Sequence, residues 1–72
     1  MTLGSRIAAW RKAKGYSQGG LADAVGVTRA AVSQWEDSQT SPSQPHLETV
    51  VKEFGLTMER FYGPIPKAKK AA

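Results

Sequence analysis

The sequence has no cysteine, which excludes disulfides and thiolate metal sites. It also lacks a signal-peptide pattern and the apolar run of roughly 18 residues that a membrane-spanning helix needs, so we expect a cytoplasmic protein. The single histidine, His46, has no cysteine, histidine or paired carboxylate at ligand spacing, so we expect no metal. No serine has a histidine base at a plausible spacing, and Gly19-Gly20 is not a phosphate loop. We therefore expect no enzymatic activity, cofactor or small-molecule ligand.

Acidic residues are fewer than basic ones: the sequence contains 6 Asp and Glu and 10 Lys and Arg, which gives a net charge of +4. This balance favours a polyanionic partner, although four charges alone also fit many soluble proteins. The length of 72 residues predicts one small domain, over residues 1–62, followed by a basic tail over 63–72. Lys67, Lys69 and Lys70 in that tail either reach nucleic-acid phosphates or form a disordered, solubilising end.

Two short helical patterns occupy residues 17–36 and join through one glycine. The first begins at Ser17, whose hydroxyl can accept a hydrogen bond from an otherwise unpaired amide of the first turn. Gly26 can take the left-handed conformation that ends a helix, and Thr28 can cap the next one. The first pattern places three apolar residues on one face: Leu21, Ala22 and Val25. This arrangement predicts a helix-turn-helix.

The second of these helices has two distinct faces at about 100° per residue. Its apolar face contains Ala31, Val32 and Trp35. We expect it to pack on the preceding helix, which leaves the opposite face pointing outward. That outward face carries Arg29, Ala30, Ser33 and Gln34. Small or hydrogen-bonding side chains suit a helix that enters the major groove of DNA, as the second helix of a helix-turn-helix does.

Residues 4–62 resemble the Cro/CI-type, or XRE-type, helix-turn-helix family, and more narrowly the DNA-binding domains of lambdoid phage repressors and Cro proteins. The matching residues are Ile7, Trp10, Arg11, Ser17-Gln18, Leu21-Ala22, Gly26-Val27-Thr28, Val32-Ser33-Gln34-Trp35-Glu36, Pro42, Leu47, Val50-Val51, Phe54 and Leu56. The resemblance implies an all-α, compact five-helix fold and sequence-specific binding of double-stranded DNA. If the chain is complete, it lacks the separate dimerisation domain of CI repressors, so we expect a Cro-like phage or prophage repressor.

The resemblance implies base contacts for the outward face of the recognition helix, about residues 28–37. Arg29 can donate two hydrogen bonds to guanine, and Gln34 can pair with adenine. The Ala30 methyl can touch thymine methyl groups, while Ser33 can bond a base, a phosphate or nothing. Each of the four also has an ordinary alternative as a surface residue or helix former. For Arg29 the contact is favoured, because a cation in the first turn opposes the macrodipole at a cost of about 0.3–1 kcal/mol.

The resemblance also implies phosphate contacts. Gln18 matches a position where the side chain and the helix N-terminus grip a phosphate, with surface glutamine as the alternative. We expect Ser17 and Thr28 to act as caps first and as phosphate donors second. Ser41 lies in the loop that, in the family, usually crosses the DNA backbone after the recognition helix. The sequence gives only weak support for a phosphate contact by Ser41.

Three further helices are expected around the motif. They cover about residues 3–14, 43–54 and 57–62, and their apolar residues recur at helical spacing. Ser43 and Thr57 can cap the last two of these helices. Trp10 and Trp35 occur at core positions, which argues against base stacking. The resemblance implies a structural ion pair between two more residues, which ties the first helix to the third: Arg11 and Glu36.

A single small domain contacts few base pairs, so we expect a homodimer, at least on DNA, bound to a near-palindromic operator. The apolar residues best placed to form its interface are Met58, Phe61, Tyr62 and Ile65, although Phe61 has the alternative of a core position. A protein-interaction module, such as an antitoxin or anti-repressor, is the alternative function.

Two segments depart from the family pattern. Gly19 and Gly20 stand where good helix formers are usual, and each costs up to about 1 kcal/mol. Asp37-Ser38 replaces a common Asn-Gly, and its carboxylate would repel phosphate unless it caps local amides.

Overall fold

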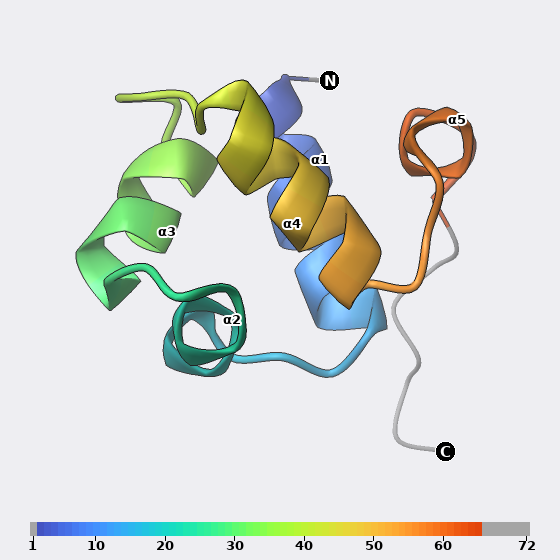
Figure 1. Cartoon of the computed structure of the whole chain (residues 1–72). Helices are drawn as coiled ribbons and strands as arrows, with labels where there is room; N and C mark the ends of the chain where they lie inside the picture. Colours follow the sequence, from blue (N-terminus) through green and yellow to red (C-terminus); the bar gives the residue numbers. More distant parts are fainter. Residues whose placement is uncertain (1, 66–72) are drawn as a thin grey trace, which may run out of the picture.

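The computed structural model describes residues 2–65, which form five helices and no strand (Figure 1). These helices are α1 (Leu3–Ala13), α2 (Gln18–Val25), α3 (Arg29–Glu36), α4 (Gln44–Glu53) and α5 (Met58–Phe61). The expected all-α, five-helix fold is confirmed, with helix ends within one or two residues of those expected. Within residues 2–65, no helix is both long and apolar enough to cross a membrane. Lys67, Lys69 and Lys70 lie outside the described residues.

All five helices begin after a residue with a side-chain hydroxyl. The N-caps are Thr2, Ser17, Thr28, Ser43 and Thr57, and each accepts a hydrogen bond from the backbone N–H three residues further on. Four of them follow from the sequence pattern, because a hydroxyl before an apolar-periodic segment satisfies one of the amides that a helix start leaves unpaired. The helix starts are therefore set by local chemistry.

The elements pack around one core (Figure 1). α3 lies against α1 and α2, α2 also contacts α4, and α4 contacts α5. The buried hydrophobic residues are Ile7, Trp10, Leu21, Ala22, Val32, Trp35, Leu47, Val50, Val51, Phe54 and Phe61. Both tryptophans are in this core, as their spacing predicts. Phe61 is fully buried, so the core alternative holds and the dimer contact expected of its side chain is corrected.

The α5 end is tied to α1 through backbone oxygens. The Trp10 indole Nε1 donates to the carbonyl of Phe61 at 3.0 Å. Arg6 Nη1 donates to the same carbonyl at 3.0 Å and to that of Gly63 at 2.8 Å. These bonds satisfy carbonyls at the end of α5 that have no partner within the helix.

Gly4 sits where α1 approaches α3 most closely. A Cβ at this position would overlap the backbone carbonyl oxygen of Trp35 and press on that of Glu36. Because backbone atoms cannot rotate away as a side-chain tip can, only glycine allows this separation of the two helices. The sequence pattern did not single out Gly4.

Candidate nucleic-acid interface

α3 presents one buried and one exposed face. Val32 is fully buried and Trp35 is 5% exposed, so the apolar side of the helix lies in the core. Arg29, Ala30 and Gln34 are exposed. A further predicted base-contact residue, Ser33, is half-buried. The structure therefore brings all four predicted residues to one helix and exposes three of them, on a helix that is anchored by its opposite side.

The turn between α2 and α3 is short. Gly26 has a φ of 77°, the left-handed conformation expected of it, and the Val27 amide donates to the Ala22 carbonyl at 2.9 Å. Because this bond closes the end of α2, α3 can start at Arg29, only three residues after Gly26, at a defined angle to α2. Packing of α3 on both α1 and α2 then fixes that angle (Figure 1).

The predicted phosphate-contact residues with hydroxyls are all exposed. The Ser17 oxygen accepts from the Gly20 amide at 2.9 Å, and the Thr28 oxygen accepts from the Ala31 amide at 3.1 Å. Both are caps, as expected, and each hydroxyl hydrogen can still be donated outward. Ser41 lies in the loop after α3, some distance along the chain from either cap.

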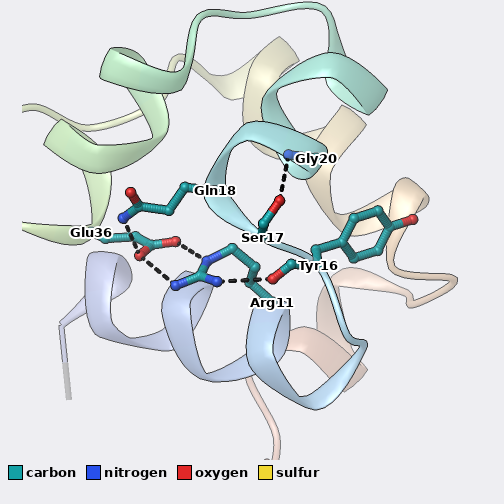
Figure 2. A network of polar contacts seen from close by, with 6 residues as sticks. All are labelled: Arg11, Tyr16, Ser17, Gln18, Gly20 and Glu36. Atoms are coloured by element: carbon teal, nitrogen blue, oxygen red, sulfur yellow. Dashed lines mark hydrogen bonds and ion pairs between the residues drawn. The ribbon is translucent and has the colours of Figure 1, made fainter.

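Arg11 and Glu36 form the ion pair that the resemblance implies (Figure 2). Arg11 Nε donates to Glu36 Oε2 at 2.6 Å and Nη2 donates to Oε1 at 3.1 Å, with side-chain exposures of 11% and 7%. Arg11 Nη1 also donates to the Tyr16 carbonyl at 2.9 Å. A single guanidinium therefore holds α1, the end of α3 and the segment before α2 together.

Gln18 joins this network, which sequence reasoning missed. Its Nε2 donates to Glu36 Oε1 at 3.0 Å (Figure 2). The side chain expected to contact a phosphate is thus already held within the protein by one of its two N–H groups.

A recess of about 440 Å³ lies between the starts of α2 and α3. Its lining residues are Arg11, Ser17, Gln18, Gly19 and Arg29. A Cβ added to Gly19 would lie 4.0 Å from Cδ of Arg29, so the arginine stem passes close to this glycine. A Cβ at Gly20 would stand 3.0 Å from the capping oxygen of Ser17. Gly20 therefore leaves room for the cap, whereas at Gly19 a Cβ would make only an ordinary van der Waals contact with Arg29.

The segment after α3 contains the second departure. Ser38 has a φ of 61° and is the only residue other than glycine with positive φ in the part of the chain that the structure describes. It occupies the left-handed position that the glycine of Asn-Gly would fill. Asp37, the C-cap of α3, is exposed.

The charge of the folded part is close to balance. Residues 2–65 contain all six acidic residues and seven of the ten Lys and Arg, which leaves a net charge of +1. In α3 and the loop over residues 37–43, Arg29 is the one cation. Asp37 contributes an exposed carboxylate to this surface, and its remaining exposed hydrogen-bonding groups are neutral hydroxyls and amides, so any DNA contact here depends on placement more than on charge.

Comparisons with known proteins agree with this geometry. Residues 7–61 match the family profile described as Helix-turn-helix. The chain is 42% identical over 50 residues to Repressor protein C2 of Salmonella phage P22, which covers 69% of this chain and 23% of that protein. It is 32% identical over 59 residues to the HTH-type transcriptional regulator PuuR of Escherichia coli (strain K12), which covers 82% of this chain and 32% of PuuR.

The solved structures include the P22 c2 repressor protein in complex with a synthetic operator. Its TM-score to this structure is 0.77 at 34% identity, covering 85% of this chain and 92% of that one. This chain spans a third or less of the length of the two curated relatives. The family match covers most of the chain, includes α2 and α3, and coincides with the structural match to the P22 c2 repressor protein. The chain therefore belongs to the XRE-type helix-turn-helix family of repressor-type, DNA-binding transcriptional regulators.

Proposed function

We propose that this chain is a Cro-like phage or prophage repressor that acts in the cytoplasm. It binds a near-palindromic operator as a homodimer, places α3 in the major groove, and blocks access of RNA polymerase. The observation that carries this proposal is the exposed polar side of α3, on a helix whose other side is locked in the core by Val32 and Trp35. The P22 c2 repressor, which this chain resembles in fold and sequence, is seen in complex with a synthetic operator.

Base recognition is assigned to four residues of α3: Arg29, Ala30, Ser33 and Gln34. Arg29 reads guanine through its paired donors, Gln34 reads adenine, and Ala30 meets a thymine methyl group. Phosphates are contacted by four neutral residues around this helix: Ser17, Gln18, Thr28 and Ser41. Hydroxyls and amides at helix starts suit this role, because they present N–H and O–H donors without requiring a charge.

A dimer is proposed because one recognition helix contacts too few base pairs for useful specificity. Two-fold symmetry would place two copies of α3 about 34–36 Å apart, one helical turn of DNA. The interface is assigned to the α5 end, where Tyr62 is 53% exposed and Met58 and Ile65 are half-buried. Met58 and Ile65 pack against the apolar core, and the Tyr62 ring meets the buried Phe61 ring edge-on, with centroids 5.0 Å apart. Sedimentation of a monomer, both free and on a palindromic duplex, would remove the dimer from the proposal.

The test begins with selection of bound duplexes from a random library at stated salt, which yields the operator. Arg29→Ala is then expected to weaken operator binding by roughly 1–3 kcal/mol and to change binding to unrelated DNA very little. Lys52→Ala is the charge-matched control, because Lys52 is exposed in the last turn of α4, outside the helix-turn-helix. Equal losses of Arg29→Ala on both DNAs would make Arg29 a phosphate contact.

If selection returns no preferred sequence, the repressor assignment fails. Tight capture of a protein partner, together with weak and sequence-independent DNA binding, would favour the interaction-module alternative.

A further inference from the structure

The carboxylate of Asp37 stands at the C-terminal end of the recognition helix without a partner. Asp37 is the C-cap of α3 and is exposed. The next three backbone amides, which its side chain could have capped, already donate to carbonyls of α3, at 3.1, 2.9 and 3.4 Å for Ser38, Gln39 and Thr40. Among the described residues, the Asp37 carboxylate takes part in no hydrogen bond or ion pair. It therefore does not cap local amides, the arrangement that would have reconciled it with a nearby phosphate.

The exposed charges at both ends of α3 oppose the helix dipole. Arg29, the first residue, places a cation at the positive N-terminal end, and Asp37 places an anion at the negative C-terminal end. Glu36 also lies in the last turn, but Arg11 pairs with it. Helix stability favours the reverse placement, with an acid in the first turn and a base in the last. This pattern indicates that the two exposed charges serve the outer surface of α3 and not its folding.

Asp37 lies on the same side of α3 as the residues assigned to base recognition. Its φ of -82° and ψ of 0° keep it close to the helical path, so the helix periodicity extends to it. At about 100° per residue, Asp37 falls about 40° from Ser33 and about 80° from Arg29, and it lies about 12 Å from Arg29 along the axis. The N-terminal residues of a recognition helix are the ones that reach base edges. In the proposed complex, Asp37 therefore lies at the opposite end, where α3 leaves the groove past the phosphate backbone.

We propose that Asp37 is a specificity-determining residue that acts by repulsion, lowering the affinity of this chain for DNA other than its operator. The inference rests on the proposed function and deepens it. When α3 is seated on the operator, base contacts fix the helix and hold the Asp37 end clear of the phosphates. On other sequences no base contact holds α3, so binding relies on attraction to phosphates, and an anion on the approaching surface weakens that attraction.

One carboxylate matters here because the surface around it carries little positive charge. Over residues 29–43, Arg29 is the one cation, and the charge of Glu36 is already matched by Arg11. Asp37 thus balances the one exposed cation of this stretch, which leaves it without net attraction for phosphates. Binding to unrelated DNA depends on that attraction, whereas base recognition depends on hydrogen bonds that Asp37 leaves in place. The ratio of operator affinity to unrelated-DNA affinity therefore rises, although Asp37 itself contacts no base.

The test compares the wild-type chain with Asp37→Asn, which keeps the side-chain shape and removes the charge. Affinities are measured on the selected operator and on an unrelated duplex. At about 0.05 M salt, Asp37→Asn should bind the unrelated duplex about threefold more tightly or better, and the operator less than about 1.5-fold more tightly. The difference should fade near about 0.3 M salt, where ions screen exposed charges. Glu48→Gln, exposed on α4 outside the helix-turn-helix, is the matched control and should change neither affinity by as much.

Each outcome separates this proposal from the repressor assignment. Equal tightening on both DNAs, or unchanged binding to the unrelated duplex, would overturn the repulsive role of Asp37 and leave the repressor assignment intact. A gain that is insensitive to salt would also overturn it, because the change would then come from the conformation of the segment after α3 and not from charge. A selection that returns no preferred sequence would overturn both.

Discussion

α1 holds two different parts of the molecule in two different ways. Toward α3 it uses side-chain charge and close approach: Arg11 pairs with Glu36, and Gly4 touches the α3 backbone. Toward α5 it uses side chains that donate to carbonyls, with Arg6 and Trp10 both reaching Phe61.

The difference lies in what each contact demands of its partner. The contact with α3 requires a carboxylate at position 36 and no side chain at position 4. The angle between α1 and α3 therefore depends on which residues occupy these two positions. The α5 contact requires only backbone carbonyls, which every residue supplies. We therefore expect substitutions to be tolerated less at the contact between α1 and α3 than at the contact between α1 and the α5 carbonyls. Substitutions at Arg11 and Gly4 test this contrast, and substitutions at Ser38 and Tyr16 set two smaller local effects beside it.

Arg11→Met should be the most damaging, lowering the free energy of unfolding by about 3–5 kcal/mol. It leaves the Glu36 carboxylate buried without a charge partner. Chemical denaturation measures the loss. Arg6→Met is the matched control on the α5 side and should cost distinctly less, because it leaves only neutral carbonyls unpaired. Equal losses for the two variants would show that the contacts of α1 with α3 and with α5 do not differ in what they require.

Gly4→Ala should come next, with a loss of about 1–3 kcal/mol, because its methyl group must push the α3 backbone away. For a domain of this size, each kcal/mol lowers the melting temperature by about 4–8 °C. Gly19→Ala is the control, since a Cβ there has ordinary van der Waals room, and it should be neutral or stabilising. A Gly4→Ala variant as stable as the wild type would show that α1 and α3 can separate without cost.

Ser38→Gly should raise stability by about 1 kcal/mol, because glycine adopts the left-handed conformation at φ of 61° without strain. Thermal melting of this variant beside the neighbouring Gln39→Gly would isolate the effect, since Gln39 lacks a positive φ. A loss of stability at Ser38→Gly would mean that flexibility gained in the unfolded chain outweighs the relief of strain.

Tyr16 should give the smallest effect, visible mainly through pH. The Glu53 carboxylate accepts the Tyr16 hydrogen bond at 2.5 Å and so raises the pKa of this phenol above its usual 10.0. A raised folded-state pKa contributes stability below about pH 10 that is lost as the pH rises through the folded value. The melting difference between wild type and Tyr16→Phe should therefore shrink between pH 8 and pH 11. A melting difference that stays constant with pH would show that the hydrogen bond from Tyr16 to Glu53 does not stabilise the fold.

Local patterns predicted the elements of this fold well, because helix starts and faces depend on nearby residues. The caps at Ser17, Thr28, Ser43 and Thr57 and the two faces of α3 all follow from short-range chemistry. The Arg11–Glu36 pair was reached only through the family resemblance, since 25 positions separate the two residues.

Other features were not accessible from the pattern. Gly4 resembles any helix residue until α3 is placed against it, and Phe61 has the same spacing whether it faces the core or a second subunit. The strain at Ser38 could have been suspected from the Asn-Gly that it replaces. The bond between Gln18 and Glu36 gave no local signal, because it joins the start of one helix to the end of another.

The sequence by itself determined where the helices begin and end, which faces are apolar, and which family the chain resembles, since these depend on residue type and short spacing. Only the tertiary structure decided that Gly4 has no room for a side chain beside α3, that the Gln18 amide donates to Glu36, and that Phe61 is buried. The reason is that each of these depends on atoms brought together from distant positions, where a single carboxylate or the absence of one methyl group sets the geometry.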